Sequence, residues 1–122
     1  MPRPIHFEIP SADPEKAIAF YSKVFNWTFH KWDGPMPYWM ISTGASPEPG
    51  IDGGLMPLQH PGQPCVNTIG VADLDASVAS VVEAGGQVAV PRMAVPGVGW
   101  LSYCTDLDGH MFGLMQADAA AS

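Results

Sequence analysis

Near its start the chain reads His6-Phe7-Glu8-Ile9-Pro10 and, after two further residues, Asp13-Pro14-Glu15-Lys16-Ala17-Ile18-Ala19-Phe20-Tyr21. Polar and apolar residues alternate in the first segment, which predicts a short strand with His6 and Glu8 on the same face. The second segment begins with aspartate and proline, a pair typical of a helix start, and its apolar residues recur at helical spacing. A helix that ends near Asn26 is therefore predicted directly after the strand.

The same order of segments recurs about sixty residues later in the chain. Four pairs of segments match at this nearly constant offset: residues 5–9 with 65–71, 13–16 with 73–76, 38–41 with 99–102, and 54–56 with 113–115. The last pair reads Gly-Leu-Met in both halves. The shared order indicates that residues 1–122 are a single domain built from two repeats, about 1–60 and about 61–122.

Each repeat is predicted to contain a strand, a helix and then several strands. The second helix is expected to begin at Asp73 and to stop at Gly85, because glycine accommodates the left-handed conformation that ends many helices. The other strands are expected around residues 28–32, 38–43, 54–58, 87–91, 99–105 and 110–116, separated by turns rich in the chain's 13 glycines and 13 prolines. The predicted fold class is α+β, with two tandem βαβββ modules.

The charge balance of the chain is acidic, since 12 Asp and Glu against 5 Lys and Arg give a formal net charge of −7. Such a chain repels polyanions, which argues against a nucleic-acid partner. No apolar stretch has the length of a membrane span or the features of a secretion signal, so we expect no membrane partner and a cytoplasmic location. Cys65 and Cys104 are too few for a disulfide scaffold and are interpreted as reduced thiols that fill space.

The His-Phe-Glu-Ile-Pro strand, the helix over residues 13–21 and the closing turn Asp106-Leu107-Asp108-Gly109 resemble the vicinal oxygen chelate superfamily. This superfamily comprises glyoxalases, bleomycin-resistance proteins and ring-cleaving dioxygenases. The resemblance covers almost the whole chain, and it implies that the two modules form a half-open, barrel-like sheet around a cleft. A homodimer is expected by this resemblance, and because a domain of this size buries little surface on its own.

The resemblance also implies four positions for metal ligands, on the first and the last strand of each module. His6 matches one of them, whereas the other three hold Val66, Gly54 and Gly113, which have no side-chain donor atom. Glu8 raises the number of donors only to two, and a catalytic metal site normally has three protein ligands. No cofactor and no metal ligand are therefore predicted, and the alternative is a divalent metal held through His6 and Glu8.

His6 and Glu8 are the predicted catalytic pair, because a carboxylate near an imidazole orients the ring and makes it more basic. The residues predicted to contact a ligand are Gly54, Met56, Val66, Thr68, Tyr103, Gly113 and Met115. Gly54 and Gly113 are interpreted as leaving empty volume in the cleft. Tyr38 and the other aromatic residues of the central strands are interpreted mainly as core.

The leading hypothesis is a metal-independent relative of glyoxalases and bleomycin-resistance proteins that binds a small organic molecule and transfers a proton through His6 and Glu8. One alternative is a protein without catalytic activity that sequesters an antibiotic or toxin, for which the acidic charge favours a cationic ligand. The other alternative is a metal-dependent lyase, isomerase or dioxygenase of the same superfamily. The residues leave open whether the protein is an enzyme at all.

Overall fold

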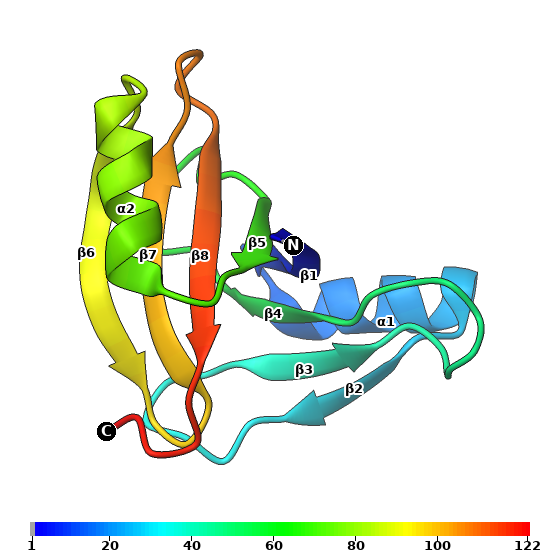
Figure 1. Cartoon of the computed structure of the whole chain (residues 1–122). Coiled ribbons are helices and arrows are strands. Elements are labelled where there is room, and N and C mark those ends of the chain that lie inside the picture. The colour runs from blue at the N-terminus through cyan, green and yellow to red at the C-terminus, as the bar shows by residue number, and fades with distance from the viewer. Residues whose placement is uncertain (1) are drawn as a thin grey trace. The chain divides into compact units, whose positions relative to one another are not determined.

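The computed structural model describes residues 2–122, and these residues form two compact units (Figure 1). One unit holds His6–Cys65, and the other holds Val66–Ser122 together with residues 2–5. The elements follow in the order β1 (Arg3–Ser11), α1 (Pro14–Phe25), β2 (Thr28–Lys31), β3 (Trp39–Ser42), β4 (Gly53–Pro57), β5 (Val66–Gly70), α2 (Leu74–Glu83), β6 (Gln87–Val95), β7 (Gly99–Thr105) and β8 (Met111–Ala117).

This order is βαβββ twice, so the predicted α+β fold class with two tandem modules is confirmed. We call β1 to β4 with α1 the first module and β5 to β8 with α2 the second module. Strand β1 is shared between the two compact units, because its first residues group with the second one. The side chain of Ile5, for example, packs over Gly70 of β5.

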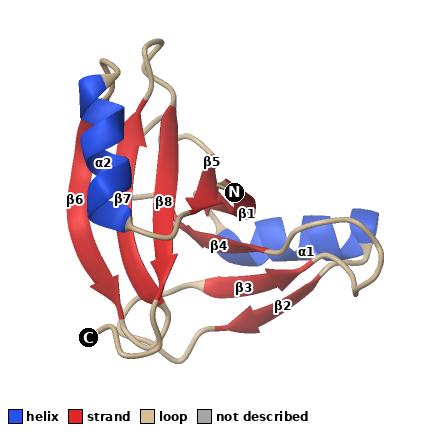
Figure 2. Ribbon diagram, in the orientation of Figure 1, coloured by secondary structure: helices blue, strands red, loops and turns tan. Residues whose placement is uncertain are grey.

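In the first module the strand order is β2-β3-β4-β1, with β1 parallel to β4 and the other neighbours antiparallel (Figure 2). Glu8 of β1 pairs with Gly54 of β4. Hydrogen bonding between these strands therefore places the first and the last strand of the module side by side, with the predicted site residues in register.

The second module repeats this arrangement with the strand order β5-β8-β7-β6, and β5 is parallel to β8. Thr68 of β5 pairs with Gly113 of β8, just as Glu8 pairs with Gly54. Backbone register thus confirms the predicted equivalence of Gly54 with Gly113, and it makes Glu8 equivalent to Thr68.

One predicted equivalence is wrong by two residues. The sequence match made Trp39 equivalent to Trp100. In the structure Trp39 pairs with Leu55 of β4, whose counterpart in the second module is Leu114 of β8. Leu114 pairs with Ser102, so Ser102 is the residue equivalent to Trp39. Register is determined by the pairing of the strands, and one aromatic residue in each half is too little to define it.

The edge strand β6 is longer than predicted. The sequence indicated an end at Pro91, whereas β6 continues to Val95 through two register shifts, one on each side of Val90. Proline lacks a backbone N–H and is tolerated at irregular positions of an edge strand, where no inner neighbour needs that donor.

Both helices begin and end as their sequences predict. The Asp13 side chain accepts a hydrogen bond from the Lys16 backbone N–H at the start of α1, and Asn26 adopts a left-handed conformation at its end, with a φ of 62°. Asp73 accepts from the Ala76 N–H at the start of α2, and Gly85 follows that helix with a φ of 101°. These side-chain bonds satisfy backbone donors that a helix start leaves unpaired.

Each module has its own core. In the first module Ile41 and Leu55 are fully buried, and the ring of Phe7 contacts Trp27, on which Tyr21 of α1 stacks. In the second module α2 lies across β6, β7 and β8 (Figure 1), where it covers a core of Leu74, Cys104 and Leu114.

The two cysteines have different environments. Both are free thiols, as predicted, but only Cys104 is buried and fills space in a core. Cys65 is exposed, so its interpretation as a space-filling residue is wrong. Across residues 2–122, neither helix combines the length and the apolar character that crossing a membrane requires.

Candidate functional site

A line of three polar side chains forms on one side of β1. The hydroxyl oxygen of Tyr38 lies 2.8 Å from His6 Nε2, and the same hydroxyl donates a hydrogen bond of 3.1 Å to Glu8 Oε2. Phe7, between the two on the strand, points the other way and contacts Trp27. Strand alternation therefore separates a polar face, with His6 and Glu8, from an apolar face that packs on the helix side.

The position of Tyr38 depends on Gly54. A Cβ atom added at Gly54 would collide with the hydroxyl and ring carbons of Tyr38, so the tyrosine occupies the space that any other side chain at position 54 would need. The interpretation of Gly54 as empty volume is therefore wrong. Glycine at this position leaves room, and the phenol of Tyr38, which directly precedes β3, fills it.

Tyr38 is the site residue that sequence reasoning missed. It precedes β3, in which Met40 pairs with Gly54, and residues two apart along a strand share a face. A diagonal neighbour is within reach of an aromatic side chain, so the ring of Tyr38 extends over Gly54. The contact could have been predicted from one pattern, in which a glycine pairs with the residue two positions after a tyrosine. Recognising this pattern requires the register of β3 and β4.

Burial dominates the electrostatics of His6. Desolvation lowers the pKa of the His6 imidazole below its usual value of 6.5, while the negative charges of Glu8 and Asp52 act in the opposite direction and only partly compensate. Burial disfavours the charged imidazolium, so His6 is neutral at physiological pH. A neutral imidazole has one nitrogen with a free lone pair, which is the form that accepts a proton or a hydrogen bond.

This lowered pKa predicts a pH dependence of stability. Between the lowered pKa of folded His6 and the unfolded value of 6.5, the unfolded chain binds a proton that the folded chain does not bind, so the free energy of unfolding falls as pH decreases through this window. We expect urea unfolding at pH 7.5 and pH 5.5 to show this loss for the wild type and a smaller loss for His6→Gln.

The matched control is His30→Gln, which removes an exposed histidine of the same module. This variant should retain the pH dependence of the wild type. Hydrogen bonds lower the pKa of two exposed carboxyl groups from the usual value of 3.8: the His110 backbone N–H donates to Asp106, and the Trp100 indole N–H donates to Asp118. The loss of stability that these groups cause therefore begins at a lower pH, outside the tested range. Equal pH dependence in all three proteins would contradict the assignment to His6.

The second module does not repeat the polar line. Val66 and Thr68, which correspond to His6 and Glu8, are buried at 7% and 3% exposure, and neither side chain titrates. The Thr68 hydroxyl lies 3.0 Å from the position that a Cβ at Gly113 would take, so the space beside this glycine is also largely filled. Of the two equivalent strand pairs, only β1 with β4 therefore carries titratable side chains at these positions.

The other predicted ligand contacts lie on β4, β7 and β8. Met56 is half-buried on β4, where it pairs with Pro10. Tyr103 is half-buried on β7, paired with Gly113. Met115 is half-buried on β8 and lines an apolar hollow of about 370 Å³ together with Ile5, Gly70, Val71 and other residues of the second compact unit. Their contact with a ligand stays a prediction.

The residues around His6 do not fit a divalent metal. His6 Nε2 is already hydrogen-bonded to the Tyr38 hydroxyl. Gly54 has no side-chain donor atom, and the Tyr38 hydroxyl fills the space beside this glycine. Three donors from His, Cys, Asp or Glu come within 4.8 Å of one another at only one place in residues 2–122, and that place does not include His6. Glu8 alone cannot complete a coordination shell with it.

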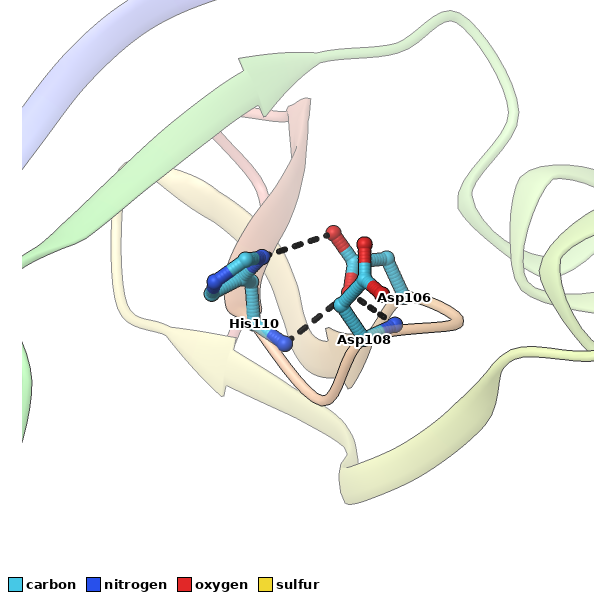
Figure 3. A group of neighbouring side chains, drawn as sticks. All are labelled: Asp106, Asp108 and His110. Carbon is cyan, nitrogen blue, oxygen red and sulfur yellow. Dashed lines mark hydrogen bonds and ion pairs between the residues drawn. The ribbon is translucent and has the colours of Figure 1, made fainter.

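The one group of three donors is a turn between β7 and β8, formed by Asp106, Asp108 and His110 (Figure 3). Asp106 Oδ1 accepts hydrogen bonds of 2.9 Å from the backbone N–H groups of both Asp108 and His110. Gly109 completes the turn with a φ of 82°. All three side chains are exposed, and the hydrogen bonds of Asp106 account for the cluster as turn structure.

A protein-family model matches most of this chain. Residues 3–114 match the Glyoxalase/Bleomycin resistance protein/Dioxygenase superfamily. The chain belongs to this superfamily. The predicted resemblance is confirmed, and it covers both modules.

Two similar curated proteins are CFP32 of Mycobacterium bovis and CFP32 of Mycobacterium tuberculosis, which are named as candidate glyoxylases. Each is 31% identical over an alignment of 123 positions, which covers 91% of this chain and 44% of the relative. The chain therefore spans less than half the length of these relatives.

Solved structures share the fold of this chain at low sequence identity. A hypothetical protein from Bacillus halodurans has a TM-score of 0.74 at 13% identity, covering 99% of this chain and 98% of that one. A methylmalonyl-CoA epimerase in complex with methylmalonyl-CoA has a TM-score of 0.73 at 17% identity, covering 98% and 97%. The epimerase from Mycobacterium tuberculosis has a TM-score of 0.72 at 15% identity, covering 94% and 87%. These similarities support the fold.

Proposed function

We propose that this glyoxalase-superfamily protein binds a small organic molecule beside β1 of its first module and transfers a proton with His6, without a metal ion. The observation that carries this proposal is the hydrogen-bonded line from His6 through Tyr38 to Glu8. A base needs a free lone pair at working pH and a partner that stabilises it after protonation. Desolvated, neutral His6 meets the first requirement, and the carboxylate of Glu8 meets the second.

The charges around His6 define the ligand class. Glu8 and Asp52 act on His6 as negative charges, and the lysine side chains of the first module lie on α1 and at the end of β2. An anionic ligand beside His6 would meet these carboxylates at close range, with a repulsion that grows as water is excluded. We therefore propose a neutral or cationic ligand, with an acidic hydrogen next to a carbonyl group as the reactive feature.

Proton exchange in heavy water tests this proposal without knowledge of the natural substrate. The probes are dihydroxyacetone and the hemithioacetal of methylglyoxal with 2-mercaptoethanol, two neutral molecules whose C–H hydrogens beside carbonyl groups are replaced by deuterium when a base removes them. We expect the wild type to accelerate exchange in at least one neutral probe. His6→Gln should lower this rate by roughly 10²–10⁴-fold, the contribution typical of a general base.

His30→Gln is the control and should exchange at the rate of the wild type, because this histidine is exposed on β2. Exchange should also be unchanged after dialysis against a chelator. A chelator-sensitive rate that nickel or zinc restores would overturn the metal-independent proposal and favour a metal-dependent lyase or isomerase. A rate that His6→Gln does not change would overturn the role of His6.

A second candidate function is stoichiometric binding without turnover. The formal charge of −7 and the carboxylates beside His6 favour a cationic molecule. Calorimetry with bleomycin, a cationic antibiotic, distinguishes this function. Saturable binding with unchanged bleomycin recovered afterwards, together with no exchange in the carbonyl probes, would favour sequestration over catalysis.

A further inference from the structure

The two contacts of the Tyr38 hydroxyl determine which atoms of the polar line carry a hydrogen. The Tyr38 oxygen contacts both His6 Nε2, at 2.8 Å, and Glu8 Oε2, at 3.1 Å. A phenol has one hydrogen and can donate to only one of these two atoms. An ionised carboxylate has no hydrogen of its own and only accepts, so the hydrogen of Tyr38 goes to Glu8.

The consequence for His6 follows from the same count. With its hydrogen committed to Glu8, the Tyr38 oxygen can only accept from the imidazole, and His6 Nε2 must carry a hydrogen. A neutral imidazole with a hydrogen on Nε2 has its lone pair on Nδ1. We infer that Nδ1 of His6 is the atom of the site that accepts the proton, and that Tyr38 is a positioning residue that imposes this tautomer on behalf of Glu8.

This inference deepens the proposed function and rests on it for the use of Nδ1, while the tautomer is a property of the protein alone. In the step that it describes, Nδ1 takes a proton from a C–H or O–H group of the ligand, and the bonding electron pair stays on the ligand. The imidazolium keeps its Nε2 hydrogen on Tyr38. The negative charge of Glu8 stabilises the imidazolium through the Tyr38 hydroxyl, because hydrogen bonds in a chain polarise one another.

Two contacts hold Tyr38 where this role requires it. Its ring meets Trp32 edge to face, with the centroids 6.2 Å apart and an angle of 76° between the planes. Its hydroxyl occupies the space that the missing side chain of Gly54 leaves. A phenol between two packed neighbours loses little freedom when it forms both hydrogen bonds, so its orientation is determined before any ligand arrives.

Nitrogen NMR of protein labelled with ¹⁵N in its histidines tests the tautomer directly. The chain has four histidines, and loss of one signal set in His6→Gln assigns His6. At pH 7.5 we expect Nδ1 of His6 to resonate as an unprotonated nitrogen and Nε2 as a protonated one. A protonated Nδ1 in the wild type would overturn the inference.

The tautomer of His6 in the Glu8→Gln variant tests the role of Glu8, because a merely structural role of Glu8 would leave this tautomer unchanged. A glutamine amide can donate to the Tyr38 oxygen, which frees the Tyr38 hydrogen for His6 Nε2 and moves the imidazole hydrogen to Nδ1. We expect the population of this second tautomer to rise by roughly tenfold, the factor that corresponds to losing the charge assistance of one hydrogen bond. An unchanged tautomer ratio would contradict the role of Glu8.

Tyr21→Phe is the matched control, because it removes the hydroxyl of a tyrosine in the aromatic stack on Trp27, away from the polar line. It should leave the His6 signals unchanged. Tyr38→Phe should shift them, and the amide spectrum of each variant reports whether the fold is intact.

The outcomes separate the two proposals. A hydrogen on Nε2 without any deuterium exchange would contradict the proposed function and leave the tautomer assignment standing. Exchange that depends on His6, together with a hydrogen on Nδ1, would support the proposed function and overturn the present inference.

Discussion

Replacing Gly54 with alanine is expected to reduce the free energy of unfolding by about 2–4 kcal/mol, which combines overpacking of a filled site with loss of a hydrogen-bonded line. The added Cβ would meet the hydroxyl and ring of Tyr38, so the tyrosine must move away from His6 and Glu8. Urea unfolding monitored by tryptophan fluorescence measures the loss. The same variant should also lose proton exchange, because the movement of Tyr38 removes the partner of His6.

The cost of this alanine should depend on Tyr38. In a Tyr38→Ala background the added Cβ has room, so the further loss caused by Gly54→Ala should fall to less than about 1 kcal/mol, which a double-mutant cycle detects. Gly113→Ala is the matched control at the equivalent position of the second module, where the nearest atom is the Thr68 hydroxyl at 3.0 Å. A threonine can shift by a few tenths of an ångström, so this control should stay within about 1 kcal/mol of the wild type. An equal cost of Gly54→Ala in both backgrounds would show that Tyr38 does not occupy the site.

Truncation of Leu74 to alanine is the second change with a large expected effect, a loss of about 2–5 kcal/mol of stability. Leu74 is fully buried and lies with Cys104 and Leu114 in the core of the second module. Its backbone N–H donates to the side chain of Gln116, and the alanine variant keeps this bond, so the measured loss reports the missing side chain. Urea unfolding again provides the measurement.

Val82→Ala is the control on the same helix. The Val82 side chain is 54% exposed, so its truncation should change stability by no more than about 0.5 kcal/mol. Similar losses for the two variants would mean that α2 does not cover the core as described.

The elements of the fold could be predicted from local residue patterns. Asp13 and Asp73 cap their helices as expected, and the Gly-Leu-Met segments 54–56 and 113–115 occupy equivalent last strands. Caps act over a few residues, and a repeat compares the sequence with itself, so neither requires knowledge of the packing.

The candidate site was predicted only in part. Alternation along β1 was enough to place His6 and Glu8 on one face, opposite Phe7. Their partner Tyr38 could not be found in the same way, because it lies just before β3, another part of the chain, and reaches the site diagonally. The lowered pKa of His6 could not be predicted from the sequence either, because it arises from burial. Sequence reasoning considered only Glu8 and predicted a raised pKa, which is wrong.

The amino-acid sequence by itself therefore determined the α+β class, the two βαβββ modules, the superfamily and the polar face of β1, because these depend on short-range periodicity and on internal similarity. Only the tertiary structure decided what fills the space at Gly54, which residue joins His6 to Glu8, and how the modules differ at equivalent positions. These features depend on which side chains meet across strands, and strand register is a property of the folded chain.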